Sequence, residues 1–177
     1  MQNKSHAVMA QRVEAKDSLD DFPTPPWATR ALLEHVISSV YAAESCLEPA
    51  CGAGHMSKVL KEYFGEVQSY DVEDYGYAER RDFLRHPHKV ESFDWVITNP
   101  PFKLAESFVL TALPIARRGV AILARTVFIE SVGRYERLFL NNPPSVGILP
   151  KRFRRNWAIR ERLSTPIGRL PFPRGAS

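Results

Sequence analysis

Short apolar segments alternate with amphipathic segments through most of this chain, and that alternation limits the folds open to it. The periodicity predicts strands and helices in turn: strands at 45–47, 66–70, 93–98, 119–124 and 145–149, and helices at 25–41, 56–64, 104–116 and 134–141. Strands that alternate with helices form mostly parallel sheets, because each helix returns the chain to the same end of the sheet. The sequence therefore predicts an α/β fold, a Rossmann-like three-layer α/β/α sandwich around a mostly parallel sheet.

The chain divides into three parts by composition. Residues 1–20 are polar and are expected to form a flexible arm, and residues 21–150 carry the alternating pattern. The first helix is expected to be capped by Thr24 and to hold Pro25 in its first turn. Residues 151–177 hold eight Arg and Lys residues against one acid, Glu161, and show no sustained period. We expect a basic tail rich in Pro and Arg there.

Location and metal content are suggested by what the sequence lacks. The N-terminal residues have no apolar core of a signal peptide, and no segment approaches the roughly 18 apolar residues of a membrane span. We expect a soluble, cytoplasmic protein without a membrane partner. The cysteines, Cys46 and Cys51, have no second Cys or His pair nearby, so neither a disulfide framework nor a metal site is expected.

A glycine turn follows the first predicted strand, in the segment LEPACGAGHM. Gly52 and Gly54 permit a tight turn and close approach to a ligand, and Asp71 ends the next strand 19 residues after Gly52. A carboxylate at that place can accept both hydroxyls of a ribose. Glu48 suits a cation rather than a pyrophosphate, and Ser57 replaces the third glycine of a dinucleotide motif. S-adenosylmethionine therefore fits better than a nicotinamide cofactor.

The second motif is NPPF, residues 99–102, which follows the strand FDWVIT. The amide of Asn99 and the carbonyl of Pro100 can accept the two N–H groups of an amino group on an aromatic ring, and Pro101 restricts the backbone. Phe102 offers a face on which a base can stack. Residues 142–144 repeat Asn-Pro-Pro but precede a strand and lack the aromatic residue, so we interpret them as a turn.

With these motifs in order, residues 20 to 150 resemble the class I (Rossmann-like) S-adenosylmethionine-dependent methyltransferases, in particular the adenine-specific DNA amino-methyltransferases of bacteria and phages. The matching segments are FPTPPWATRALLEHV, LEPACGAGHM, RRDFL and DWVITNPPFKLAESF. The resemblance implies methyl transfer from S-adenosylmethionine to the exocyclic amino group of adenine, with DNA as the partner. Transfer is expected to be direct and in line, without a covalent intermediate on Cys51.

The resemblance also implies roles for individual residues. Thr24 and Pro25 would contact the methionine part of the cofactor, Asp82 its adenine amino group, and Phe83 its adenine ring. The implied cofactor-binding residues are Thr24, Pro25, Glu48, Pro49, Ala50, Gly52, Gly54, Asp71, Asp82, Phe83 and Asn99. The implied catalytic residues are Asn99, Pro100, Pro101 and Phe102. His55 is expected to be a loop residue and not a base, since the amino group need not lose a proton before attack.

Two features leave alternatives open. Members of this family continue into two further strands that form an antiparallel edge, whereas this chain has the basic tail, so we expect an incomplete, truncated C-terminal edge. No segment resembles a separate target-recognition domain. The alternatives are the same chemistry on RNA adenine or on a protein glutamine, or an inactive remnant. A nicotinamide-linked dehydrogenase would leave NPPF unexplained.

Overall fold

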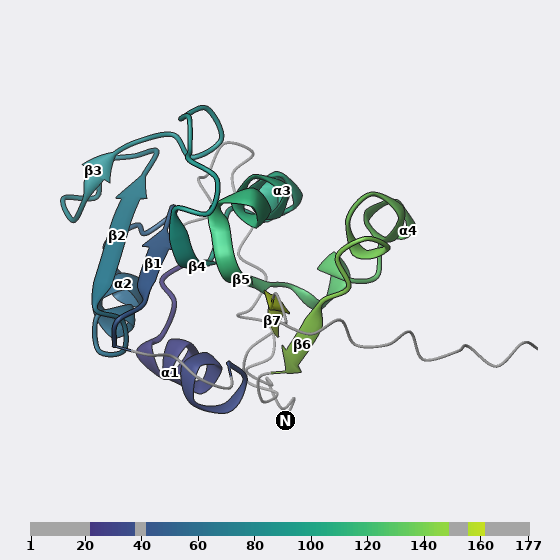
Figure 1. The fold of residues 1–177 in the computed structure, drawn as a ribbon, viewed down its shortest axis with the longest axis horizontal. Coiled ribbons are helices and arrows are strands. Elements are labelled where there is room, and N and C mark those ends of the chain that lie inside the picture. The colour runs from purple at the N-terminus through teal and green to yellow at the C-terminus, as the bar shows by residue number, and fades with distance from the viewer. Residues whose placement is uncertain (1–21, 38–41, 149–155, 162–177) are drawn as a thin grey trace, which may run out of the picture.

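A twisted, mostly parallel sheet forms the centre of the molecule (Figure 1). The computed structural model describes residues 22–37, 42–148 and 156–161. Within these ranges seven strands are ordered β3-β2-β1-β4-β5-β7-β6. Their bounds are β1 Ser45–Glu48, β2 Glu66–Asp71, β3 Glu79–Arg80, β4 Phe93–Thr98, β5 Ala116–Ala124, β6 Ser145–Ile148 and β7 Asn156–Glu161. Neighbouring strands from β3 to β5 pair in parallel, and β7 pairs antiparallel with both β5 and β6.

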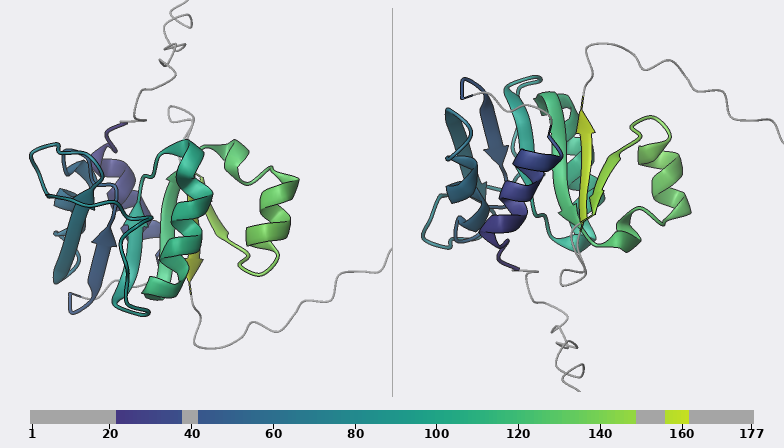
Figure 2. Two further views of the ribbon diagram at one scale, coloured as in Figure 1. Left: turned by 90° about the horizontal axis from the view of Figure 1, so that it is seen from above. Right: turned by 90° about the horizontal axis from the view of Figure 1, so that it is seen from below.

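Helices cover both faces of the sheet (Figure 2). One face carries α1 (Pro26–His35) and α2 (His55–Leu60), and the other carries α3 (Ala105–Ile115), which follows the 3-10 turn η2 (Phe102–Leu104). After β5 come the 3-10 turn η3 (Thr126–Phe128), the short α4 (Val132–Arg134) and the π-helical turn η4 (Tyr135–Phe139). The predicted three-layer α/β/α sandwich is confirmed. Over the described ranges, no helix combines the length and apolar character that crossing a membrane requires.

Alternation along the central strands sends side chains into a separate core on each face. Cys46 and Trp95 pack with α1 and α2, whereas the next residues along their strands, Leu47 and Val96, pack with α3. All four side chains are at most 1% exposed. Both faces of the central strands are therefore buried, which explains their nearly continuous apolar sequences.

Several element boundaries differ from those predicted. The first helix begins at Pro26, and Pro25 is its N-cap residue. Among the described residues, no side chain accepts a hydrogen bond from the N–H groups of the first turn. Thr24 is therefore not the cap but a buried residue, 4% exposed, in the segment before the helix. The part of this helix predicted over 38–41 lies outside the described residues. β3 was missed because two residues are too few to show a period.

The expectation of an incomplete C-terminal edge is wrong. Residues 156–161, inside the segment interpreted as an irregular tail, form β7, which is inserted between β5 and β6. Its six residues lie between segments rich in Arg and Pro, so local sequence carried little indication of a strand. The pairing of β7 with two neighbours decides its conformation, since strand formation depends strongly on sheet context. The other residues of the predicted arm and tail, 1–20, 151–155 and 162–177, lie outside the described residues.

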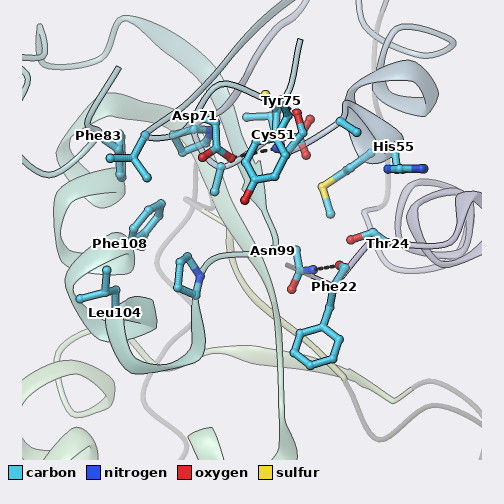
Figure 3. A pocket seen from close by; sticks show the side chains of 18 of the residues that line it. Phe22, Thr24, Cys51, His55, Asp71, Tyr75, Phe83, Asn99, Leu104 and Phe108 are labelled. Carbon is cyan, nitrogen blue, oxygen red and sulfur yellow. Dashed lines mark hydrogen bonds between the residues drawn. The ribbon is translucent and has the colours of Figure 1, made fainter. Parts of the chain in front are cut away.

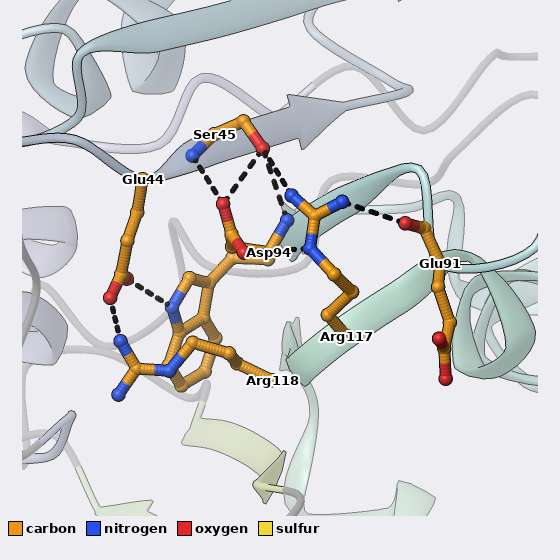
Figure 4. A network of polar contacts seen from close by, with 7 residues as sticks. Glu44, Ser45, Glu91, Asp94, Arg117 and Arg118 are labelled. Carbon is orange, nitrogen blue, oxygen red and sulfur yellow. Dashed lines mark hydrogen bonds and ion pairs between the residues drawn. The ribbon is translucent and has the colours of Figure 1, made fainter.

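The amino ends of the central strands are joined by a network of polar contacts (Figure 4). Asp94 accepts hydrogen bonds from the backbone N–H of Ser45 at 2.9 Å and from Nε of Arg117 at 2.9 Å. Glu44 accepts a bond from Nε1 of Trp95 at 2.9 Å and forms an ion pair with Arg118. These contacts link β1, β4 and β5 at the end of the sheet where the strands begin, which leaves the opposite end for a ligand.

The order of the strands reverses at β1. The chain passes from β1 to β2 on one side of β1, and later returns to place β4 on its other side. Open α/β sheets bind ligands at the carboxyl ends of the strands where such a reversal occurs. In this chain β1 ends at Glu48 and β4 is followed directly by Asn99.

Candidate active site

A cavity of about 330 Å³ lies at the carboxyl ends of β1, β2 and β4. Its walls come from the segment before α1, the glycine turn, the end of β2, the loop after β3, and the NPPF segment with η2 and α3 (Figure 3). These segments are far apart in sequence, and the parallel sheet brings them together because its strands all end at one edge. The cavity holds three carboxylates in its wall, those of Glu48, Asp71 and Asp82.

The glycine turn requires its glycines at the two positions where the sequence has them. Gly52 has φ 50° and Gly54 has φ 78°, both in the left-handed region that side chains with Cβ disfavour. A Cβ on Gly54 would also overlap the ring of Tyr77. Gly54 is the N-cap residue of α2, so the turn leads directly into that helix. His55, predicted to be in a loop, is its first residue and lines the cavity.

Asp71 at the end of β2 holds the glycine turn in place. Its Oδ2 accepts a hydrogen bond from the N–H of Gly52 at 2.8 Å, and its Oδ1 accepts one from the N–H of Glu73 at 3.1 Å. A carboxylate offers about four acceptor positions, so each oxygen keeps one for a ligand. Asp71 can therefore organise the turn and still accept two hydroxyl groups.

Glu48 has a buried carboxyl group at the end of β1, with an exposed fraction of 1%. Burial raises its pKa well above the ordinary range, and the nearby charge of Asp71 adds to this, whereas the hydrogen bond donated by Ser57 acts in the opposite direction. The hydroxyl groups of Ser57 and Ser69 lie 2.7 Å apart and extend this polar cluster. A cation beside Glu48 would favour its charged form.

Asp82 and Phe83 lie in the loop after β3 and both line the cavity. Asp82 accepts a hydrogen bond from the N–H of Leu84 at 3.0 Å, and its other oxygen lies 3.5 Å from Nε of Arg85. Phe83 is 2% exposed, and its ring lies 5.0 Å from that of Phe108 on α3. The loop thus presents a carboxylate beside a fixed aromatic ring, which is suited to an aromatic ligand with an amino group.

Asn99 has its side-chain amide oriented by the segment before α1. Its Nδ2 donates a hydrogen bond of 2.9 Å to the backbone carbonyl of Phe22 (Figure 3). A carbonyl oxygen can only accept, so this contact determines which end of the amide faces Phe22. Oδ1 is consequently at the other end of the amide, where it is an acceptor for a ligand in the cavity.

Phe102 starts η2 just outside the cavity wall. Its ring centroid lies 5.7 Å from that of Phe22, with the planes 31° apart, and the guanidinium carbon of Arg125 lies 4.3 Å from the same centroid. The ring of Phe102 is therefore in contact with the ring of Phe22 and with the guanidinium group of Arg125, and it does not face the cavity directly.

The structure brings most of the predicted site residues to the cavity. Those that line it are Thr24, Glu48, Pro49, Ala50, Gly52, Asp71, Asp82, Phe83, Asn99 and Pro101. The predicted residues that do not line it, all within the described ranges, are Pro25, Gly54, Pro100 and Phe102. Pro25 and Gly54 are the N-cap residues of α1 and α2, so they position neighbours that do line the cavity.

Several wall residues were not predicted from the sequence. Phe22 and Tyr75 lie in segments without a period, and Leu104 and Phe108 follow the expected pattern of an ordinary helix face. The position of Tyr75, in the loop just after Asp71, was a weak indication that it lines the site, whereas no local pattern indicated Phe22.

Cys51 also lines the cavity, as the residue before Gly52. Burial raises the pKa of its thiol to about 12, and the charges of Glu48 and Asp71 act in the same direction. A thiol with this pKa is protonated at neutral pH and is a poor nucleophile. Across the described residues, no group of three or more His, Cys, Asp or Glu side chains is arranged to hold a metal ion.

Comparison with known proteins yields matches in structure alone. No protein-family model matches the chain, and no curated protein sequence matches it. A dimethyladenosine transferase from Plasmodium falciparum is similar, with a TM-score of 0.58 and 16% identity over 80% of this chain and 64% of that chain. A protein assigned as an RNA methyltransferase from Pyrococcus horikoshii has a TM-score of 0.58 and 18% identity over 81% of this chain and 86% of that chain.

A third similar structure is the geranyl diphosphate C-methyltransferase from Streptomyces coelicolor, in complex with S-adenosyl-L-homocysteine. Its TM-score is 0.56, with 10% identity over 76% of this chain and 78% of that chain. The chain has the class I methyltransferase fold. This fold explains why the cavity lies at the carboxyl ends of β1, β2 and β4. A fold does not determine which substrates bind, so these must be inferred from the side chains of the cavity.

Proposed function

We propose that this chain binds S-adenosylmethionine and transfers its methyl group to the exocyclic amino group of adenine in DNA. The orientation of the Asn99 amide is the observation that carries the proposal. Its Nδ2 is engaged by the Phe22 carbonyl, so its Oδ1 can accept from an amino group at the cavity. The class I methyltransferase fold of similar proteins supports the proposal, and the residues of the cavity make it specific.

The charges of the wall fit this cofactor. S-adenosylmethionine carries a sulfonium and an ammonium group, and Glu48, Asp71 and Asp82 face the same cavity. The free acceptor positions of Asp71 suit two ribose hydroxyls, and Asp82 beside the Phe83 ring suits an adenine with its amino group. The cost of burying Glu48 falls when a cation approaches it, so cofactor binding and this carboxylate support each other.

The turn fits a dinucleotide poorly. A pyrophosphate needs free N–H groups on the glycine turn. Here the N–H of Gly52 is bound to Asp71 at 2.8 Å, and the N–H of Gly54 is bound to the carbonyl of Cys51 at 2.8 Å. A phosphate at Gly52 would also meet the negative charge of Asp71. The dehydrogenase alternative is therefore disfavoured.

The chain's own groups would promote transfer by positioning. When bound, S-adenosylmethionine supplies an electrophilic methyl group. Asn99 Oδ1 would accept one N–H group of the target amine, and the carbonyl of Pro100, the residue between the wall residues Asn99 and Pro101, would accept the other. This turns the lone pair of the amine out of conjugation with the ring. The amine becomes more nucleophilic without prior loss of a proton, and the protonated product releases that proton to water afterwards. The protonated thiol of Cys51 takes no part.

The experiment that tests the proposal combines cofactor binding with transfer. We expect calorimetric binding of S-adenosylmethionine to the wild type, and transfer of labelled methyl groups to adenine-containing DNA. Asn99→Ala should retain cofactor binding to within a few fold and lose at least about 100-fold in kcat, the loss typical of removing one group that stabilises the transition state. Absence of cofactor binding by the folded protein would support the inactive remnant.

RNA is the second candidate acceptor, because a similar structure is assigned as an RNA methyltransferase. The same labelled cofactor distinguishes the acceptors when DNA, RNA and protein are offered separately. If RNA or a glutamine-containing protein is labelled and DNA is not, the DNA part of the proposal is refuted while the amino-group chemistry stands. Nucleoside mass spectrometry of DNA from expressing cells would identify the modified base.

A further inference from the structure

Phe22 contacts two of the proposed catalytic residues at once. Its carbonyl accepts the hydrogen bond from Asn99 Nδ2 at 2.9 Å, and its ring lies 5.7 Å from the ring of Phe102. It also lines the cavity (Figure 3). An amino group bound to Asn99 Oδ1 belongs to a flat ring, and two aromatic residues adjoin Asn99: Phe22 is bonded to it through its carbonyl, and Phe102 follows it three residues later in the chain.

The two aromatic residues belong to different kinds of segment. Phe102 starts η2 directly after the NPP turn, and Arg125, which lies over its ring, follows the last residue of β5. Both are attached to the ends of central strands. Phe22 precedes α1 in an irregular segment outside the sheet. A change in the separation of the two rings therefore costs less if Phe22 moves than if Phe102 does.

The present separation is too small for a base. A flat ring held between two others needs two contacts of about 3.5 Å, and hence roughly 7 Å between the outer rings. The observed 5.7 Å between centroids is roughly 1.3 Å short of this. The rings thus close on each other, and a modest outward movement of Phe22 would admit a base.

We propose that Phe22 is the second aromatic wall of the target-base position, and that the base enters between Phe22 and Phe102. The inference rests on the proposed function, since it takes the base to be the one whose amino group meets Asn99. Base binding then replaces one contact between two phenyl rings with two stacking contacts, which offsets part of the cost of unstacking the base from its strand. Arg125 adds a positive charge beside this position, which suits the phosphates of a nucleic acid.

The test measures binding and catalysis in three variants. Phe22→Leu removes the aromatic face, Phe22→Tyr retains it, and Tyr135→Leu changes an exposed aromatic residue (54% exposed) that does not line the cavity. Labelled oligodeoxyadenylate and oligodeoxythymidylate are titrated in the presence of saturating S-adenosylhomocysteine, which occupies the cofactor position. We expect about ten-fold weaker binding of oligodeoxyadenylate to Phe22→Leu, the size of one lost base stack, and wild-type binding to the other two variants.

The kinetic readout separates a wall residue from a residue with a merely structural role. Phe22→Leu keeps its backbone carbonyl and hence the orientation of Asn99, so the KM for DNA should rise about ten-fold while kcat changes less than about two-fold. Equal affinity of Phe22→Leu and wild type for oligodeoxyadenylate would overturn the inference. An equal loss in Tyr135→Leu would overturn it as well. If Phe22→Leu does not fold, Phe22→Met removes the ring with a similar volume and gives the same test.

The outcomes distinguish this inference from the proposed function. A wild type that binds oligodeoxyadenylate through Phe22 but transfers no methyl group contradicts the proposed function and supports the base position. If the wild type and Phe22→Leu methylate DNA with the same KM, the role of Phe22 is contradicted and the proposed function stands. A wild type that binds oligodeoxyadenylate no better than oligodeoxythymidylate, in the folded and cofactor-loaded state, contradicts the base position.

Discussion

Replacing Asn99 by aspartate changes one N–H donor into an acceptor without changing the shape of the side chain. In the wild type, Nδ2 donates to the Phe22 carbonyl at 2.9 Å. Asn99→Asp would place a carboxylate oxygen against that carbonyl oxygen, so two acceptors would face each other. We expect the side chain to turn away from Phe22, and the acceptor for the target amine to lose its position.

The size of the effect follows from this contact. The lost hydrogen bond and the carbonyl left without a donor together cost about 1–3 kcal/mol of the free energy of unfolding. For a chain of 177 residues, each kcal/mol lowers Tm by about 2–4 °C, so Tm should fall by roughly 2–12 °C. The same free energy lost in the transition state lowers kcat about 5- to 150-fold.

The loss in Asn99→Asp should depend on pH. The facing carbonyl disfavours the charged form and raises the pKa of the introduced carboxyl group. Below that pKa the protonated acid can donate its O–H to the Phe22 carbonyl, as the amide does in the wild type. The loss of stability and of kcat is therefore complete above the raised pKa and diminishes as the pH falls through it.

Asn142→Asp is a matched control, because Asn142 also donates its Nδ2 to a backbone carbonyl, that of Leu138, at 3.2 Å. Thermal unfolding and labelled methyl transfer are measured for both variants from acid to neutral pH. Asn142→Asp should lower Tm without lowering kcat. Wild-type Tm and kcat in Asn99→Asp at neutral pH, or an equal fall of kcat in both variants, would refute this role of the Asn99 amide.

Three further predictions concern the turn, the buried acid and the polar network. Gly54→Ala should lower the free energy of unfolding, measured in urea, by about 2–4 kcal/mol, because Gly54 has φ 78° and an added Cβ would overlap the ring of Tyr77. An equal loss when the substitution is made in a Tyr77→Ala background would contradict the overlap. Burial raises the pKa of Glu48, so its contribution to stability is full below an unfolded pKa of 4.5 and is lost as the pH rises through the folded value. Glu48→Gln should remove this loss of stability with rising pH, as measured by Tm at a series of pH values. Equal slopes of Tm against pH in the variant and the wild type would contradict the role of Glu48. The hydrogen bond from Arg117 holds the pKa of Asp94 below its ordinary value. Asp94→Ala should therefore lower the free energy of unfolding by about 2 kcal/mol at neutral pH, and by less as the pH falls below about 3.8. The affinity for the cofactor, measured by calorimetry, should not change. A change in that affinity would show that the network acts on the cavity.

The strands that carry the site were predictable because their local signals are strong. The predicted strand at 93–98 is β4, and the one at 66–70 is β2 less its last residue. Both are apolar or alternating segments that end at a polar residue. β7 was not predictable in the same way, since Asn156–Glu161 lies within a segment rich in Arg and Pro. Its conformation depends on the hydrogen bonds that β5 and β6 offer to it.

The sequence by itself determined the layers of the fold and the edge at which the polar residues collect. Glu48, Asp71 and Asn99 each end or follow a parallel strand, and parallel strands end at one edge of the sheet, so their proximity follows from the order of elements. The tertiary structure alone decided the contact between Phe22 and Asn99, which are 77 residues apart. A hydrogen bond between such distant residues leaves no period in the sequence. The orientation of the amide, and with it the chemistry available at the cavity, therefore emerges only when the chain is folded.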